Sequence, residues 1–326
     1  MSTWPPADTA PLAFDTPVPN GGYAWWYLDA ISDDGQHAMT AIAFIGSVFS
    51  PYYARARRHD AGTADPLNHC AFNIALYSKK NGWGQSQWAM TERGRHSVVR
   101  SNTRLGIGAS AMQWGGQGLD LAVNEITTPW GRRLHGNINV SPSTSHCSVY
   151  ALDKHNRHQW CPIAPSARVE VSFSQPDVHW SGTGYLDSNR GARPLELDFQ
   201  RWDWSRASLS GGRSAVLYDT TLCNHETRSL ALEFDTAGTA RTFVAPPLVA
   251  LPDTAWRVKR NTRSDHVTRP IHGLEDGPFY ARTLVRSHLL GESALAMHES
   301  LDLQRWRKPI VQLMLPFRMP RWTRKA

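Results

Sequence analysis

Short stretches in which apolar and polar residues alternate run through almost the whole chain. Alternation with a period of two places the apolar side chains on one face of an extended strand. Clusters of glycine, asparagine, aspartate or proline separate these stretches, among them SDDG, KKNG, GGQG and DTAG. Helical periodicity is rare by comparison. The pattern predicts an all-β fold of antiparallel strands, built as barrels or sandwiches with little helix.

The length of the chain favours two β units over one, since 326 residues exceed what a single small sheet needs. The proline- and serine-containing run WCPIAPS, at residues 160–166, is the best candidate for a linker. We therefore predict an N-terminal β domain over residues 1–165 and a C-terminal β domain over residues 166–326.

The positive charge of the chain is concentrated near its C-terminal end. The formal net charge is +7, and no acidic residue follows Asp302. Seven basic residues lie beyond that point: Arg305, Arg307, Lys308, Arg318, Arg321, Arg324 and Lys325. A nucleic-acid-binding protein usually carries its basic residues over a folded face. This distribution therefore argues against nucleic acid as a partner.

The last segment, RWRKPIVQLMLPFRMPRWTRKA, mixes these basic residues with tryptophan, phenylalanine, leucine and methionine. Its three prolines, Pro309, Pro316 and Pro320, exclude one continuous helix. Basic and aromatic residues around an apolar middle are typical of a segment that lies on an anionic membrane surface. A final strand with a solvated basic end is the alternative, and both interpretations stay open.

Tryptophan is unusually frequent, with 14 residues, which favours an aromatic-lined site or a membrane-interface belt over an ordinary core. The run YAWWYLD near the N-terminus shows the pattern. In a strand, Tyr23, Trp25 and Tyr27 share one face, and Trp26 and Leu28 share the other. Bulky residues on both faces predict a strand that is buried on both sides. Two interpretations are open: the strand belongs to the core of a barrel, or some of its rings line a ligand cavity.

The run DKHNRHQWCP contains a candidate group for proton transfer. At strand spacing His158 and Trp160 face the same way, so His158 is a candidate to move a proton and Trp160 to stabilise a cation with its ring face. An exposed histidine in a turn is the alternative. Neither the spacing of His155 and His158 nor that of the four cysteines matches a metal-binding motif, so no metal is expected.

The run DVHWSGTGYLDSNRG offers a carboxylic acid. Tyr185 and Asp187 share a face in an extended strand, and Gly182 and Gly184 predict a bulge or bend before them. Residues 187–191 have the composition of a turn, because Asp and Asn side chains bond their own backbone there. Asp187 is therefore either a turn residue or an acid at the end of an aromatic strand.

Five spaced motifs together resemble the carotenoid 1,2-hydratase family, also called hydroxyneurosporene synthases: GGYAWWYLDAISDDG, YYARARR, DPLNHCAFNIALY, WAMTERGR and HWSGTGYLDSNRG. The resemblance spans Asn20 to Leu315. It implies two lipocalin-like barrels, an architecture shared with tocopherol cyclases. It also implies addition of water to the terminal C1–C2 double bond of an acyclic carotene such as neurosporene or lycopene. No cofactor would take part, and the protein would work at the cytoplasmic face of a photosynthetic bacterium's membrane.

Hydration of such an alkene begins with a proton on C2, leaves a tertiary cation at C1 and ends with attack by water. A buried carboxylic acid suits the first step, since burial raises its pKa, and aromatic ring faces stabilise the cation. With the resemblance, this chemistry assigns the acid to Asp187, beside Tyr185, the water to His158 and the cation to Trp160. Substrate contacts are expected from Trp25, Trp26, Tyr27, His179, Trp180 and Asn189. A cyclase that acts on a polyene or quinone, or a non-catalytic carrier of hydrophobic ligands, is the alternative.

Overall fold

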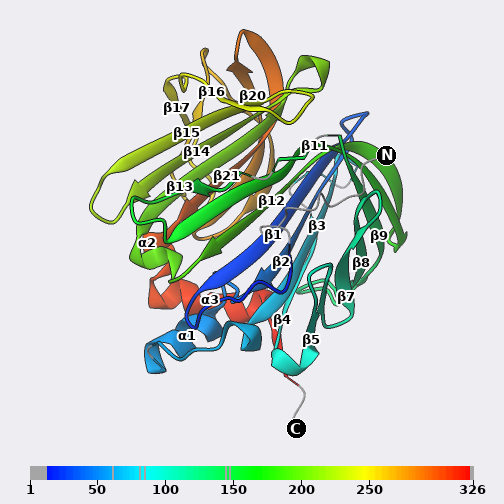
Figure 1. Cartoon of the computed structure of the whole chain (residues 1–326), viewed down its shortest axis with the longest axis vertical. Helices are drawn as coiled ribbons and strands as arrows, with labels where there is room; N and C mark the ends of the chain where they lie inside the picture. The colour runs from blue at the N-terminus through cyan, green and yellow to red at the C-terminus, as the bar shows by residue number, and fades with distance from the viewer. Residues whose placement is uncertain are drawn as a thin grey trace.

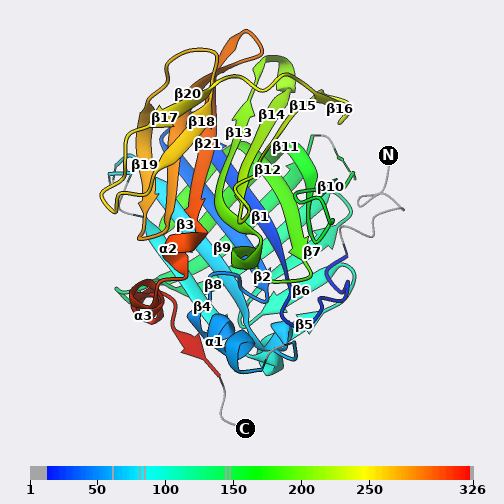
Figure 2. The ribbon, with the colours of Figure 1, turned by 90° about the vertical axis from the view of Figure 1, so that its left-hand side faces the viewer.

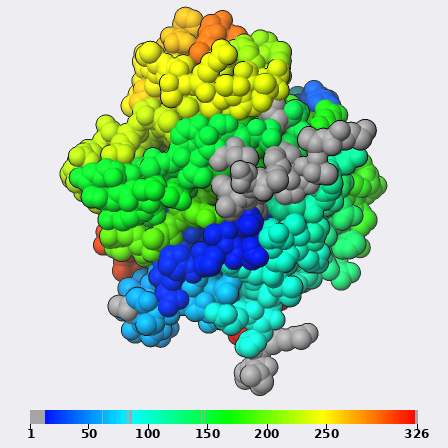
Figure 3. All heavy atoms as spheres, viewed as in Figure 1, coloured from blue at the N-terminus to red at the C-terminus, as the bar shows by residue number. Residues whose placement is uncertain are grey.

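The computed structural model describes residues 13–60, 62–80, 82–83, 86–143, 145–146 and 148–323. Most of these residues lie in strands, which form two large curled sheets and a short two-stranded one (Figure 1). The space-filling view shows the two large sheets packed into one continuous body (Figure 3). The predicted all-β, lipocalin-like class with little helix is confirmed.

The first sheet is built from the N-terminal half of the chain and one short strand from its end. Its order is β22-β4-β3-β2-β1-β12-β11-β9-β8-β7-β6-β5, and β10 pairs with β11. The strands are β1 (Tyr23–Ser32), β2 (His37–Ile45), β3 (Cys70–Ser78), β4 (Gln87–Arg93), β5 (Val98–Arg100), β6 (Arg104–Ile107), β7 (Ser110–Gly115), β8 (Gly118–Ile126), β9 (Arg133–Pro142), β10 (Tyr150–Ala151), β11 (His158–Gln175), β12 (Asp177–Gly191) and β22 (Arg321–Trp322).

The first sheet curls around a core of its own. Trp26 and Leu28 of β1 pack inside this curl, against side chains such as Trp114 of β7. The alternate side chains of β1, Tyr23 and Tyr27, belong to a second core that faces the other large sheet. The strand is therefore buried on both sides, as its bulky residues at consecutive positions predicted.

The second sheet is built from the C-terminal half, in the order β16-β15-β14-β13-β21-β20-β19, and a β17–β18 pair lies beside it. Figure 2 shows this sheet in front of the first. Its strands are β13 (Phe199–Ser208), β14 (Ser214–Leu222), β15 (Thr227–Phe234), β16 (Ala240–Thr242), β19 (Pro270–Asp276), β20 (Tyr280–Leu289) and β21 (Glu292–Asp302), and the pair is β17 (Leu248–Leu251) with β18 (Arg260–Arg263).

The chain passes from the first sheet to the second between Gly191 and Phe199, through the short 3-10 helix η4 (Leu195–Leu197). The linker predicted at residues 160–166 is wrong, because these residues lie inside β11. The register between β11 and β12 shifts between Pro162 and Ala167. Such irregularities accommodate proline within a sheet. The predicted domain boundary near residue 165 therefore falls within a paired strand.

The run that has the composition of a turn, residues 187–191, is also strand. It pairs with β1 on one side and with β11 on the other. The predicted bend at Gly182 and Gly184 is replaced by close packing. A Cβ atom on Gly182 would lie 2.0 Å from the carbonyl oxygen of Ile31, so only glycine fits there. The glycines of this run mark close approach of neighbouring strands and not a change of direction.

The α-helices of the described residues gather towards one end of the molecule (Figures 1 and 2). They are α1 (Pro51–His59), α2 (Leu303–Trp306) and α3 (Pro309–Arg318). The 3-10 helices besides η4 are η2 (Pro66–Asn68), η3 (Arg95–Ser97) and η5 (Ser210–Gly212). The C-terminal segment is not one continuous helix, since Pro309 begins α3 and Pro320 follows it, but Pro316 lies inside α3 and does not end it. The alternative of an ordinary final strand holds only for β22, which pairs in parallel with β4. Arg324 and Lys325 lie outside the described residues.

Candidate active site

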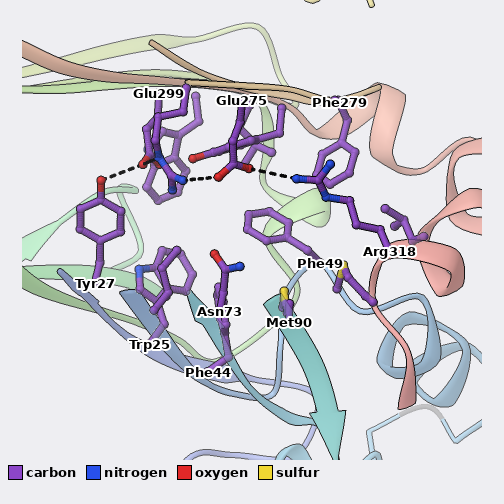
Figure 4. A pocket seen from close by; sticks show the side chains of 18 of the residues that line it. Trp25, Tyr27, Phe44, Phe49, Asn73, Met90, Glu275, Phe279, Glu299 and Arg318 are labelled. Atoms are coloured by element: carbon purple, nitrogen blue, oxygen red, sulfur yellow. Dashed lines mark hydrogen bonds and ion pairs between the residues drawn. The ribbon is translucent and has the colours of Figure 1, made fainter. Parts of the chain in front are cut away.

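A cavity of about 300 Å³ lies between the two large sheets, with α3 at one side. Aromatic and aliphatic side chains from both sheets make up most of its wall. Those from the first sheet include Trp25, Phe44 and Trp88, and those from the second include Trp202, Trp204 and Tyr218. Figure 4 shows Trp25, Phe44 and Met90 on one wall and the carboxyl groups of Glu275 and Glu299 on the other. The cavity therefore suits a largely apolar molecule.

Asp187 lines this cavity from β12 and is buried. Its Oδ2 accepts two hydrogen bonds, from the indole Nε1 of Trp160 at 2.8 Å and from the hydroxyl of Tyr185 at 2.8 Å. Its Oδ1 has no hydrogen-bond partner among the described residues. Two donors fix the carboxyl group by one oxygen, and the other oxygen is buried without a hydrogen-bond partner among the described residues.

Burial raises the pKa of Asp187 to about 8, although the hydrogen bonds from Trp160 and Tyr185 lower it. The nearby negative charges of Glu299 and Asp29 add to the increase. The group is therefore largely a neutral acid at pH 7. Because Oδ2 accepts from two donors, the acid proton resides on Oδ1.

A second polar cluster lies on the wall formed by the second sheet. Arg282 of β20 is buried and donates through Nε to Oε1 of Glu299 at 2.7 Å and through Nη1 to Oε1 of Glu275 at 2.7 Å. Tyr27 of β1 donates to the same oxygen of Glu299 at 2.8 Å, which joins the two sheets (Figure 4). The cluster supplies a buried cation between two carboxylates and keeps both oriented.

Several residues predicted from the sequence do meet at this site. Trp25, Tyr27 and Asn189 line the cavity together with Asp187. Tyr185, which the sequence placed beside the acid, donates a hydrogen bond to it. Trp160 is fully buried beside Asp187 but is absent from the cavity wall, so its geometry suits orientation of the acid more than stabilisation of a cation.

His158 is placed away from the cavity. Its Nδ1 is 2.8 Å from the hydroxyl of Tyr23, and its Nε2 is 2.8 Å from Oδ2 of Asp198. The ring is fully buried, and burial lowers the pKa of the imidazole. Both nitrogens are engaged within the protein, so this geometry argues against the water-handling role predicted for His158.

Three other predicted substrate contacts lie elsewhere. Trp26 points into the core of the first sheet, on the opposite face of β1 from the cavity. His179 is 60% exposed and bonds Ser172 and Asp177. Trp180 stacks on His37 near the outer end of β12. His179 and Trp180 precede Asp187 by eight and seven positions on the long strand β12, so they lie far from the cavity along that strand.

The contribution of the second sheet was missed. Trp202 and Trp204, at alternate positions of RWDWS, lie on the cavity face of β13, and their spacing was the available signal. The carboxyl group of Glu299 and its partner Arg282 carried no such signal, because they are single charged residues on separate strands. No group of three potential metal ligands occurs among the residues that the structure describes.

Two curled, lipocalin-like sheets that enclose an aromatic cavity with a buried neutral acid define a class of proteins suited to acid chemistry on apolar molecules. Residues 41–326 match the family model described as carotenoid hydratase CrtC. The chain belongs to this family, which confirms the family and the enzyme class, a hydro-lyase, predicted from the sequence.

Individual relatives agree with this assignment. The chain is 52% identical to an acyclic carotenoid 1,2-hydratase of Thiocapsa roseopersicina over 311 residues, which cover 94% of this chain and 75% of that protein. It is 48% identical to the enzyme of the same name from Rubrivivax gelatinosus, with the same coverage. Among solved structures, a protein described as AttH from Nitrosomonas europaea shares the fold, with a TM-score of 0.57, 16% identity, and coverage of 86% of this chain and 92% of that one.

Proposed function

We propose that this protein adds water across the terminal C1–C2 double bond of an acyclic carotene such as lycopene or neurosporene, with Asp187 as the proton donor. The observation that carries the proposal is the acid itself. Asp187 lines the cavity, its pKa is raised to about 8, its Oδ2 is held by two donors, and its Oδ1 has no hydrogen-bond partner among the described residues. An alkene is a very weak base, so protonation needs a neutral acid placed against it in surroundings that exclude water.

The reaction follows from this geometry. The proton on Oδ1 of Asp187 passes to C2, and the double-bond electrons leave a tertiary cation at C1. Trp204 and Trp202 line the opposite wall, and we assign the stabilisation of that cation to their ring faces, at roughly 0.5–2 kcal/mol for each well-placed ring. Water then bonds to C1 and gives the 1-hydroxy carotene.

Oxygen-18 water tests this assignment. Lycopene incubated with the protein in labelled water is expected to give a product that carries one labelled hydroxyl group for each hydrated end, as measured by mass spectrometry. A cyclised product without added oxygen would support a cyclase instead. Tight binding with no product would support a carrier.

The pH dependence of the rate is a further prediction. The protonated form of Asp187 is active and its pKa is raised to about 8, so kcat/KM is expected to be level at neutral pH and to fall as the pH rises through about 8. The hydrogen bond from Tyr185 lowers that pKa, so Tyr185→Phe is expected to move the midpoint to higher pH. The measurement is kcat/KM against pH for both proteins.

Tyr150→Phe is the matched control for this experiment. The hydroxyl of Tyr150 bonds His146, not the acid, although its ring packs on Trp160. The pH midpoint of kcat/KM for Tyr150→Phe should equal that of the unchanged protein. A Tyr185→Phe midpoint that stays in place or moves to lower pH would contradict the assignment of the titrating group to Asp187.

The membrane surface is the partner that we propose for α3. Ile310, Leu313 and Phe317 recur at helical spacing and are 63%, 68% and 84% exposed, whereas Val311 and Leu315 of the same helix are buried. Two exposed basic residues precede this apolar face: Arg307 and Lys308. Such a face matches an anionic bilayer surface. Within the described residues, no helix is long and apolar enough to cross a bilayer.

The position of α3 relates this surface to the cavity. Met314, Leu315 and Arg318 line the cavity, so the same helix borders the cavity and carries the exposed apolar face. A carotene dissolves in lipid and not in water, so a cavity beside a docked helix receives its substrate directly from the bilayer. The cavity is small for a long polyene and suits one end of it. Location at the cytoplasmic face of the membrane remains a prediction.

Binding to vesicles tests this surface. The double variant Leu313→Ser and Phe317→Ser is expected to weaken binding to anionic phospholipid vesicles by roughly tenfold or more, because each side chain loses apolar burial of about 1.5–3 kcal/mol at most. Co-sedimentation at low and high salt measures it. The control is Val244→Ser with Val267→Ser, which removes two equally exposed apolar side chains outside α3. Equal binding by both double variants would exclude α3 as the docking face.

A further inference from the structure

A second carboxyl group faces the cavity from the sheet opposite the acid. Glu299 of β21 lines the cavity, and both hydrogen bonds that the described residues make to it, from Tyr27 and Arg282, end on Oε1. Its Oε2 is therefore available to the cavity. Two donors on one oxygen, with the other oxygen left over, repeat on this wall the arrangement found at Asp187.

Strand register places this group near the acid. Tyr27 of β1 and Asp187 of β12 are direct partners in the antiparallel pair, so their side chains leave the sheet side by side with Cβ atoms about 4.5–5.5 Å apart. The hydroxyl of Tyr27 reaches Glu299 on the far wall. The carboxyl group of Glu299 is therefore separated from the sheet that carries the acid by about the length of the Tyr27 side chain. Its charge also acts on the ionisation of Asp187, as expected at short range.

The two carboxyl groups differ in the charge of the side chains that bond them. Arg282 is buried and contacts Glu299 directly, whereas no basic side chain among the described residues bonds Asp187. Arg282 pairs its charge with the carboxylate of Glu299, whereas burial without a counter-ion favours the neutral form of Asp187. A neutral acid and a salt-bridged carboxylate in one cavity are the pair that addition of water to an alkene requires.

We propose that Glu299 is the base that orients the attacking water and takes its proton, in the role that the sequence assigned to His158. This inference rests on the proposed hydration. Asp187 gives its proton to C2, the oxygen of water bonds to C1, and a proton of that water passes to Oε2 of Glu299. Glu299 then releases a proton to solvent and Asp187 takes one up, so that the sum is alkene plus water to alcohol. Tyr27 and Arg282 are positioning residues that hold Oε1.

The role predicts a particular failure when the base is removed. Without Glu299 the cation at C1 still forms, but water captures it slowly, so the cation returns a proton to the Asp187 carboxylate and the alkene is regenerated. In heavy water this return leaves deuterium in the recovered carotene. Loss of the acid, by contrast, prevents both hydration and exchange.

The test follows hydroxylated product and deuterium in recovered lycopene together, in heavy water. Glu299→Gln is expected to lower the product by about 10²-fold or more while deuterium in the recovered lycopene persists or rises. Asp187→Asn is expected to lose both signals. The control is Glu292→Gln, on the same strand but bonded to Arg213 outside the cavity, which should behave as the unchanged protein.

The possible outcomes separate the two proposals. Hydration by Glu299→Gln at the unchanged rate, or loss of deuterium to the same extent as in Asp187→Asn, would overturn the role of Glu299. An Asp187→Asn protein that still hydrates lycopene would instead overturn the proposed acid. If Glu299→Gln does not fold, as judged by circular dichroism, Glu299→Asp keeps the charge beside Arg282 and withdraws it from the cavity. It should show the same shift towards exchange, and an unshifted ratio would reject the base.

Discussion

Asp187→Asn is expected to lose hydration of lycopene by about 10²–10⁴-fold, the usual contribution of a general acid. The amide has nearly the shape of the carboxylic acid and still offers an oxygen to Trp160 and Tyr185, so the strand pairing around it has no reason to change. It has no proton acidic enough for an alkene. The rate of product formation in detergent, with folding checked by circular dichroism, measures the effect.

The matched control is another aspartate with a raised pKa, which is half-buried. Asp203 of β13 has its pKa raised by burial to about 6, but it bonds Ser300 and is absent from the cavity wall. Asp203→Asn should keep hydration within a few-fold of the unchanged protein. A similar loss in both variants would show that the effect is structural, and full activity in Asp187→Asn would remove it as the acid.

Replacement of Arg282 by methionine is expected to lower the free energy of unfolding by about 3–5 kcal/mol, the usual cost of removing one partner from a buried ion pair. Arg282 is 2% exposed and contacts Glu275 and Glu299 at once. It also bonds Tyr77 at 2.7 Å. The methionine fills similar space but leaves Glu299 without its cation and Glu275 with only Arg318, at 3.9 Å. Denaturation by urea, followed by tryptophan fluorescence, measures the change.

Arg286→Met supplies the comparison for this stability experiment. Arg286 lies on the same strand, four residues further along, and is exposed. Its replacement should change the free energy of unfolding by less than about 0.5 kcal/mol, as for most surface substitutions. Equal stability of the Arg282→Met and Arg286→Met proteins would mean that the two glutamates do not depend on Arg282.

Much of the fold was predictable because alternation reports burial directly. Tyr23 to Leu28 showed both faces of β1 as buried, and the structure assigns one face to each core. The linker and the turn were wrong for a common reason. Proline near residue 162 and the Asp-Ser-Asn-Arg-Gly run carry local signals, but pairing with two neighbouring strands outweighs them. The presence of glycine, as at Gly182 and Gly184, does not by itself distinguish a bend in a strand from close packing of neighbouring strands.

The site was predictable only on the first sheet. Tyr185 and Asp187 are two residues apart, so strand spacing alone placed them on one face, and the structure joins them by a hydrogen bond. Glu299 reaches the same cavity from another sheet, through a contact with Tyr27 across the fold. Sequence spacing holds no information about which strands of two sheets face each other. His158 was predicted because it lies two residues from Trp160, yet both of its ring nitrogens are bonded within the protein and it does not line the cavity.

The location of the cavity between two sheets, and not inside the curl of the first, separates the scaffold of the proton donor from most of the opposite wall. The proposed acid and its two donors stand on β11 and β12, which are anchored by a core that the cavity does not enter. Much of the opposite wall comes from strands that share no backbone pairing with them. Exchanges of cavity side chains on that wall that neither face the cation nor hold Glu299, such as Tyr218 of β14, can therefore remodel which hydrocarbon end is accepted while the proton donor stays in place. Engineering of new alkene specificities should begin on that wall.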